Sequence, residues 1–380
     1  MNDVISFTKM LISRPSVTPT DHGCQELIAN ELKKTGFHIE ILPFEDVTNL
    51  FAWHGEGSSP CLIFVGHTDV VPPGELREWS TDPFQPIEKE GYLYGRGAAD
   101  MKSGVAAMTL AAKSFVEKHP KHAGKIALIF TSDEEGPAIN GVVKVVEHLK
   151  NKNIRPDYVI VGEASSNERV GDAIKIGRRG SMHGELMIIG KQGHIAYPQK
   201  ADNPIHRSFS TLSALAETKW DEGNEFFLPS SFQFYDIQSG VGAANVIPGT
   251  LTAKFNFRFA PSSTPESLQM KVAEILDQQK INYNIKYNVS SLPYFSGECH
   301  LSRTCQAVIK EMDHIDCVPN THGGTSDGRH FAKIGAQIIE LGPVNKTIHK
   351  VNECTNIAEL HQLQKIYYKI LEKLFAIGDS

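Results

Sequence analysis

The chain has 380 residues and carries 38 Lys and Arg against 44 Asp and Glu, so its formal charge is −6 when its 16 histidines are neutral. This acidic balance gives no sign of the basic stripe typical of nucleic-acid binders, and the apolar runs are far shorter than the ~18 residues of a membrane span. We therefore expect neither a nucleic-acid partner nor a membrane partner. At roughly 150 residues per domain the length predicts two or three domains.

The N-terminal sequence and the cysteines both favour the cytoplasm. The first residues lack the basic start, apolar stretch and cleavage site of a secretory signal. The 6 cysteines include no Cys-x-x-Cys pair, which argues against a zinc ribbon or a disulfide frame and predicts reduced packing residues. The feature that stands out is the supply of 16 histidines beside 44 carboxylates.

Helical and strand periods alternate through residues 1–165, which is typical of an α/β domain with a largely parallel sheet. Asp21 is expected to cap a helix that ends at Gly36. Apolar runs predict three strands, and a run of small residues predicts a helix between the first two. These elements are strands 61–65, 126–130 and 158–161 and helix 103–118.

The pattern changes near Gly177. Residues 180–292 predict an inserted α+β domain with antiparallel-looking strands, so residues 1–179 and 293–380 would form one discontinuous outer domain. The inserted elements are strands 181–189, 231–238, 249–259 and 283–289 and helices 205–220 and 265–280, the second capped by Ser263 or Thr264. The outer domain is completed by helix 301–312, strand 337–341 and helix 357–375.

Polar clusters follow the apolar strands, and in an open α/β sheet ligands bind beyond the carboxyl ends of the strands. The clusters occupy residues 66–69, 95–102, 131–136, 162–163 and 347–350. They offer imidazoles and carboxylates but no thiol, which suits an open zinc site better than a closed structural one. His67 and Asp69 project to the same side of an extended chain, so Asp69 is expected to accept the ring N–H of His67.

Each cluster alone also fits a turn or a solvated loop. The segment that begins at Gly95 could open a dinucleotide-binding loop, but Asp100 stands where the third glycine of that motif belongs. What favours a metal site is that every cluster lies where an α/β sheet places its ligands.

These segments resemble the signatures of the di-zinc aminoacylase/carboxypeptidase family. The resembling motifs are Gly-His-Thr-Asp at 66–69, Gly-Arg-Gly-Ala-Ala-Asp-Met-Lys at 95–102, Asp-Glu-Glu-Gly at 133–136 and Gly-Glu-Ala-Ser at 162–165. More selective matches occur at 177–181, 192–198, 245–248, 323–329 and 347–353, and the resemblance covers nearly the whole chain. It implies a zinc-peptidase-like catalytic domain with an inserted dimerisation domain.

The resemblance also implies the metal ligands. Asp100 would bridge two zinc ions per subunit, with His67 and Glu163 completing one site and Glu135 and His349 completing the other. Cobalt is expected to be able to replace one of the zinc ions. A cis peptide bond would follow Asp100.

The catalytic residues implied by the resemblance are Glu134, Asp69 and His194. Glu134 neighbours a ligand, so it would stand beside the reacting water and act as the general base. His194 taken alone also fits an exposed loop histidine. The resemblance implies that it reaches the active site of the partner subunit in a homodimer, where it would stabilise the oxyanion.

The resemblance implies hydrolysis of a small N-acyl amino acid, with N-succinyl-L,L-2,6-diaminopimelate as the expected substrate. Its three carboxylates need arginines and neutral donors. The expected substrate contacts are Arg178, Arg179, Ser181, Tyr197, Asn245, Arg258, Gly324, Thr325 and Asn345. Each arginine alone would equally fit a surface ion pair. Ala164 and Ala244 depart from the proline and asparagine that relatives often have, and the second change weakens the expected contact of Asn245.

Two other functions fit parts of this pattern. A related deacylase, such as one acting on N-acetylornithine, or a carboxypeptidase of the same family would share the metal ligands. A binding protein that kept the fold but lost the chemistry would also share them, but it needs no general base at Glu134. His330 lies outside the ligand set and is expected to be non-catalytic.

Overall fold

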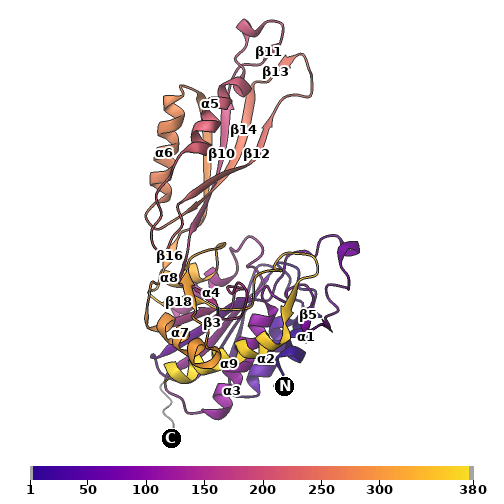
Figure 1. The fold of residues 1–380 in the computed structure, drawn as a ribbon, viewed down its shortest axis with the longest axis vertical. Helices are drawn as coiled ribbons and strands as arrows, with labels where there is room; N and C mark the ends of the chain where they lie inside the picture. Colours follow the sequence, from indigo (N-terminus) through magenta and orange to yellow (C-terminus); the bar gives the residue numbers. More distant parts are fainter. Residues whose placement is uncertain (1–2, 376–380) are drawn as a thin grey trace. The chain divides into compact units, whose positions relative to one another are not determined.

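The structure, a computed structural model, describes residues 3–375. The chain divides into two compact units (Figure 1). The first unit comprises Met1–Gly177, Ser296–Asn320 and Ser326–Ser380, and the second comprises Arg178–Phe295 and Thr321–Thr325. Residues 1–2 and 376–380, the ends of the expected outer domain, lie outside the described part.

The first unit contains an eight-stranded sheet in the order β1-β2-β6-β3-β7-β18-β8-β17. Its strands are β1 His38–Phe44, β2 Val47–His54, β3 Cys61–His67, β6 Lys125–Thr131, β7 Tyr158–Val161, β8 Ala173–Lys175, β17 Val318–Asn320 and β18 Gln337–Glu340. The neighbours β6, β3, β7 and β18 are parallel, as predicted, and so are β17 and β8. The other pairings, at the β1–β2–β6 edge and between β18 and β8, are antiparallel, so the sheet is mixed but mostly parallel.

The antiparallel edge of this sheet has a local cause. A two-residue turn at Glu45 and Asp46 joins β1 to β2, and Glu45 adopts a positive φ of 54°. A turn this short can connect only antiparallel neighbours. Strand β1 also contains Pro43, a residue that an outer strand tolerates.

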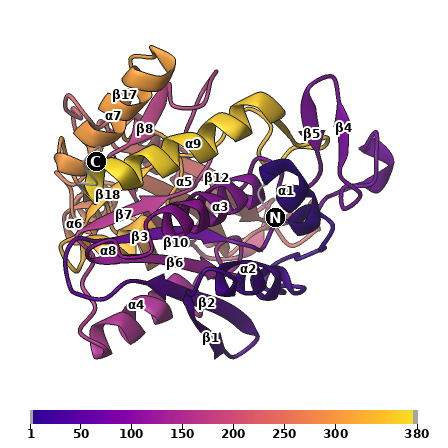
Figure 2. The same ribbon diagram turned by 90° about the horizontal axis from the view of Figure 1, so that it is seen from below.

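Helices cover both faces of the sheet (Figure 2). They are α1 Val4–Ile12, α2 Cys24–Lys33, α3 Lys102–Lys118, α4 Val142–Asn151, α7 His300–Asp313, α8 Gly328–Ala332 and α9 Ile357–Leu374. Helices α3 and α9 pack together on one face, and α4 and α8 contact each other on the other. Every residue of the central strand β3 is buried, which explains its continuous apolar run.

Helix α2 differs from the prediction at both ends. It begins at Cys24, and its N-cap is Gly23 in the left-handed conformation (φ 78°) rather than Asp21. The Asp21 carboxylate instead accepts the Gln25 N–H at 3.1 Å and the Thr68 hydroxyl at 2.7 Å. The helix ends at Lys33, before Gly36.

The second unit is built on an antiparallel sheet in the order β12-β14-β10-β15. Its strands are β10 Gly180–Ile189, β12 Ser231–Ser239, β14 Thr250–Phe259 and β15 Asn282–Ser291, and its helices are α5 Pro204–Glu217 and α6 Pro265–Gln278. Strand β14 alternates buried and partly exposed residues, so one face of the sheet forms a core with the helices. Thr264, and not Ser263, caps α6 by accepting the Ser267 N–H.

Shorter elements complete the two units. The strands are β4 Ile87–Lys89, β5 Tyr92–Tyr94, β9 Gly177–Arg178, β11 Gly193–His194, β13 Val246–Ile247, β16 Tyr294–Phe295 and β19 Cys354–Asn356, and two 3-10 turns span Leu76–Glu78 and Pro198–Lys200. The six cysteines are free thiols, four of them buried. Within residues 3–375, none of the helices combines the length and the apolar character of a membrane span.

Candidate metal centre

The parallel strands of the first unit deliver their polar side chains to one edge of the sheet. His67 is the last residue of β3, Glu134 and Glu135 follow β6, and Glu163 follows β7. Because these strands run parallel, their carboxyl ends lie at the same edge. Asp100 lies in the segment before α3. The peptide bond between Asp100 and Met101 is cis, as the resemblance implies.

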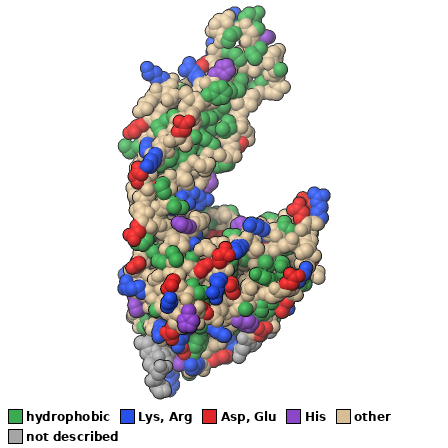
Figure 3. Space-filling model, viewed as in Figure 1, with side chains coloured by type: hydrophobic (Ala, Val, Ile, Leu, Met, Phe, Trp, Pro, Cys, Tyr) green, Lys and Arg blue, Asp and Glu red, His purple; other side chains and the backbone are tan. Residues whose placement is uncertain are grey.

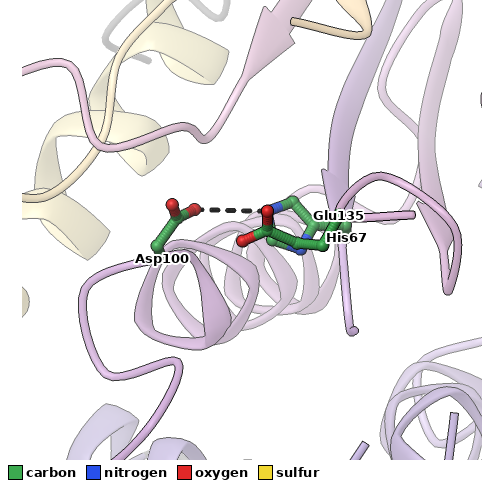
Figure 4. A group of neighbouring side chains, drawn as sticks. All are labelled: His67, Asp100 and Glu135. Atoms are coloured by element: carbon green, nitrogen blue, oxygen red, sulfur yellow. Dashed lines mark hydrogen bonds and ion pairs between the residues drawn. The ribbon is translucent and has the colours of Figure 1, made fainter. Parts of the chain in front are cut away.

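Asp100 stands between two imidazoles. Its Oδ1 lies 3.2 Å from Nε2 of His67, and its Oδ2 lies 3.2 Å from Nε2 of His349. Nε2 of His349 also lies 2.9 Å from Oε1 of Glu135, and Nε2 of His67 lies 3.8 Å from Oε1 of Glu163. Figure 4 shows Asp100 facing His67 and Glu135 across a short gap. One carboxylate therefore offers one oxygen to each imidazole.

These donors fit divalent metal ions of the zinc type. Two groups have ligand atoms within 4.8 Å of one another: His67, Asp100 and Glu135 form one, and His67, Glu134 and Glu163 form the other. Imidazole nitrogens with carboxylate oxygens, and no thiolate, are the donors of open zinc sites. Grouping the ligands by distance alone therefore places Glu135 with His67, whereas the resemblance places Glu135 with His349. The pair contacts follow the resemblance, because Asp100 touches both imidazoles and Glu135 touches His349.

Asp69 orients His67 in a way that the sequence analysis predicted only in part. The ring Nδ1 of His67 lies 2.8 Å from the backbone carbonyl of Asp69, whereas the nearest oxygen of the Asp69 carboxylate is 3.6 Å away. The carbonyl therefore takes the ring N–H and leaves Nε2 for a metal. The Asp69 carboxylate instead accepts the backbone N–H groups of Glu134 at 3.3 Å and Glu135 at 3.1 Å. One residue thus fixes both the imidazole and the acidic pair.

The electrostatics of the centre favour a bound cation. Burial raises the pKa of Glu134 to about 8, and the charges of Asp327, Glu135 and Asp100 contribute in the same direction. Burial, followed by the charge of Asp100, also raises the pKa of Glu163. Hydrogen bonds to Asp100 and Glu135 raise the pKa of His349 to about 10. Carboxylates packed this closely repel one another until positive charge is present.

The expected substrate residues of the second unit form two groups. Near the start of β10, Ser181 is opposite Arg258 of β14 in the strand register, and the charge of Arg258 adds to burial in lowering the pKa of Arg179. Arg178 is buried, and its guanidinium donates to the His322 carbonyl beside Gly324 and Thr325.

The second group lies around β11. The rings of His194 and Tyr197 are 5.6 Å apart, and the Asn245 carbonyl accepts the Ile195 N–H at 3.0 Å. All three predicted residues are exposed. Asn345 belongs to the first unit, where its N–H donates to the Ser166 carbonyl at 3.0 Å.

Two buried acids of the first unit have no role in the sequence analysis. Asp327 is 4% exposed, and burial, opposed by Arg329, raises its pKa to about 6. Glu353 is fully buried and accepts backbone N–H groups from the segment that carries Asp100. Both residues lie in segments that carry the family resemblance, 323–329 and 347–353, which is the only sequence signal pointing to them.

Comparison with known proteins identifies the fold and its relatives. The pattern of peptidase family M20/M25/M40 matches residues 63–373. A protein of Coxiella burnetii named succinyl-diaminopimelate desuccinylase is 61% identical over 374 residues, which cover 98% of this chain and 100% of that protein. Two solved structures are similar over nearly their whole length and confirm the predicted fold class. They are the M20 family metallo-carboxypeptidase Sso-CP2 of Sulfolobus solfataricus (TM-score 0.83, 18% identity, 100% of both chains) and YXEP of Bacillus subtilis, a dinuclear metal-binding M20 peptidase (TM-score 0.75, 14% identity, 99% and 98%).

Proposed function

The chain belongs to peptidase family M20/M25/M40, and from this we propose that it is a zinc-dependent amide hydrolase that cleaves N-succinyl-L,L-2,6-diaminopimelate to succinate and L,L-2,6-diaminopimelate. The observation that carries the proposal is the Asp100 carboxylate between His67 and His349, in a chain 61% identical to a desuccinylase. We further propose that Co²⁺ can replace one of the two zinc ions. The free thiols support a reducing, cytoplasmic compartment for the reaction.

His67, Asp100, Glu135, Glu163 and His349 would hold the metal ions, which would supply Lewis acidity to polarise the amide carbonyl and to lower the pKa of water in the site. We assign the proton transfers to Glu134. Its carboxylate removes a proton from the attacking water and delivers it to the leaving nitrogen as the C–N bond breaks. The products are the succinate carboxylate and a free amine. Asp69 holds Glu134 in place through the backbone N–H.

We propose that residues of the second unit bind the substrate carboxylates. Arg178, Arg179 and Arg258 supply positive charge, and guanidinium groups bind carboxylates in a bidentate way. Burial lowers the pKa of Arg258, so an anionic ligand would be stabilised beside it. The proposed neutral contacts are Ser181, Tyr197, Asn245, Gly324 and Thr325 of the second unit, together with Asn345 of the first unit.

We also propose that the second unit, with expected limits at 180–292, forms a homodimer interface. Strand β12 is an outer strand of its sheet and exposes Tyr235 (59%) and Ile237 (51%). Phe209 on α5 is 65% exposed, and Figure 3 shows hydrophobic side chains on the surface of this unit. An outer strand with exposed apolar side chains is prone to pair with another chain. The dimer would bring His194 to the active site of the partner.

Gly323→Ala tests the role of Arg178 from a neighbouring position. An added Cβ would lie 2.1 Å from Nη1 at the far end of the Arg178 side chain, so the guanidinium must move. Losing a charge-assisted contact of about 1.5–3 kcal/mol should raise KM for the succinylated substrate about tenfold to a hundredfold, with a smaller change in kcat.

Gly335→Ala is the matched control, because Gly335 also has a positive φ (84°) but an added Cβ meets nothing within 4 Å. It carries the backbone cost without the displacement of Arg178. If Gly323→Ala and Arg178→Lys both keep the wild-type KM, Arg178 does not bind the substrate.

The proposed activity is tested by counting metal and measuring product. The purified protein should bind about two zinc ions per chain and release succinate from N-succinyl-L,L-2,6-diaminopimelate, with N-acetylornithine turned over at least about tenfold less efficiently because it lacks two of the carboxylates. The opposite preference would identify a related deacetylase. Absence of succinate from the metal-loaded protein overturns the proposal.

A further inference from the structure

We propose that Glu353 is a positioning residue for the metal centre, which ties the loop that carries Asp100 to the segment that carries His349. The proposal rests on the proposed function only in taking Asp100 and His349 as ligands. Glu353 itself belongs to neither candidate ligand group and acts through the backbone.

The carboxylate of Glu353 is saturated by donors from one loop. Its Oε1 accepts the N–H groups of Ala99 at 2.8 Å and Asp100 at 2.9 Å. Its Oε2 accepts the Gly97 N–H at 3.0 Å and Nη1 of Arg96 at 2.7 Å. The side chains of Glu353 and Arg96 are 1% and 2% exposed, so solvent does not compete with these bonds. Four charge-assisted bonds to one buried anion fix the positions of the anion and of its four donor groups.

The loop depends on this anion for its shape. Residues 95–101 lie outside regular helix and strand, and Gly97 has a φ of 83°. The amides of Gly97, Ala99 and Asp100 converge on one point and form an anion-binding concavity. Without an acceptor there, three buried N–H groups would be unsatisfied. The direction in which Asp100 leaves the backbone therefore follows from where the Glu353 oxygens lie.

The same residue fixes the segment of His349. Glu353 directly precedes β19, whose Cys354 pairs with Tyr94 of β5, and β5 leads into the Asp100 loop. The ladder continues one step further, because the Gly95 N–H donates to the Glu353 carbonyl at 3.0 Å. Asp100 and His349 are thus held by one set of contacts around a single carboxylate.

The backbone at His349 needs such support. His349 has a φ of 59°, in the left-handed region that costs a side-chain-bearing residue free energy. Arg96, which donates to the Glu353 carboxylate, also donates at 3.3 Å to the carbonyl of Lys350, the residue that follows His349. The turn is closed by Thr347, whose hydroxyl accepts the Cys354 N–H at 3.1 Å. Moving Glu353 would therefore release Asp100 and His349 together.

A buried ion pair can also stabilise the fold without positioning any ligand. A measurement of metal binding distinguishes these two roles. Glu353→Gln keeps the size of the side chain but removes its charge and presents an NH₂ group to backbone donors. The probe is Co²⁺ alone, titrated into the metal-free protein and followed by its visible absorption, which reports ligand geometry. We expect the affinity of at least one of the two ions to fall about tenfold to a hundredfold and its spectrum to change.

Glu31→Gln is the matched control. Glu31 and Lys113 form a buried ion pair at 2.7 Å between α2 and α3, with side chains 6% and 5% exposed, and neither belongs to the candidate ligand groups. This variant should lose stability while keeping the wild-type Co²⁺ affinity and spectrum. If Glu353→Gln does not fold, Arg96→Lys decides by the same readout, because it keeps the positive charge but removes the guanidinium whose Nη1 donates to both Glu353 and the Lys350 carbonyl.

The outcomes are separable. Wild-type protein that binds no Co²⁺ overturns the proposed metal centre itself. Wild-type protein that binds two ions, together with a folded Glu353→Gln or Arg96→Lys variant of unchanged affinity and spectrum, overturns the positioning role and leaves the proposed function standing. A weakened site in the variant, absent from Glu31→Gln, supports the role.

Discussion

Glu134→Gln should reduce hydrolysis by about 10²- to 10⁴-fold while the protein keeps its metal, because positioned proton transfer contributes about that much to catalysis. The side chain of Glu134 is partly buried and lies close to His67 and Glu163, and its backbone is held by Asp69. Glutamine has the same shape but cannot take a proton from water. The measurement is kcat for succinate release together with the metal content of the same sample.

Glu135→Gln provides the contrast within the same loop. Glu135 contacts Nε2 of His349 at 2.9 Å and is a proposed ligand, so its replacement should lower metal content as well as kcat. The two neighbours therefore separate loss of chemistry from loss of metal. Full turnover by Glu134→Gln would show that another group moves the proton, and equal metal loss in both variants would make Glu134 a ligand.

The strand ends were predictable from the sequence for a simple reason. His67 and Glu163 directly follow short apolar runs, and parallel strands deliver their carboxyl ends to one edge. The Asp100 loop was predictable only through its resemblance to a family, since a Gly-rich turn before a helix fits several functions. Periodicity also identified every long element of the second unit, although the helix predicted over 205–220 ends at Glu217.

Contacts between distant segments were not predictable. The sequence contains no sign that Glu353 accepts the amide of Asp100, because a carboxylate can pair with any backbone N–H and these two residues are 253 positions apart. The same ambiguity explains Asp69. A sequence pattern can place Asp69 beside His67, but it cannot decide between its carbonyl and its carboxylate as the acceptor.

The hairpin β1–β2 shows a different limit. Strand β1 mixes charged and apolar residues and contains Pro43, so its composition does not resemble the buried runs of β3 or β6. Outer strands are exposed on one edge and tolerate such sequences. The identity of such a strand depends on its tertiary pairing, here with β2, and this is why the antiparallel edge of the sheet was not predicted from the sequence.

His194→Ala should lower kcat about 10²- to 10³-fold, the loss typical of an oxyanion donor, without removing metal. His194 lies in the second unit and is absent from both candidate metal groups, which contain residues of the first unit only. The variant alone does not reveal which subunit His194 serves. Mixing it with Glu134→Gln does.

In a mixed dimer, the subunit with His194→Ala keeps Glu134 and receives His194 from its partner, whereas the other subunit lacks its base. With random exchange, half of the dimers are mixed and one of their two sites is complete, so activity should recover to about a quarter of the wild-type value. Differently tagged subunits verify the exchange. If His194 serves its own subunit, both sites of the mixed dimer lack one group and the mixture stays inactive. If the exchange is verified and activity does not recover, the shared active site is excluded, because only a His194 that serves the partner subunit gives the mixed dimer a complete site.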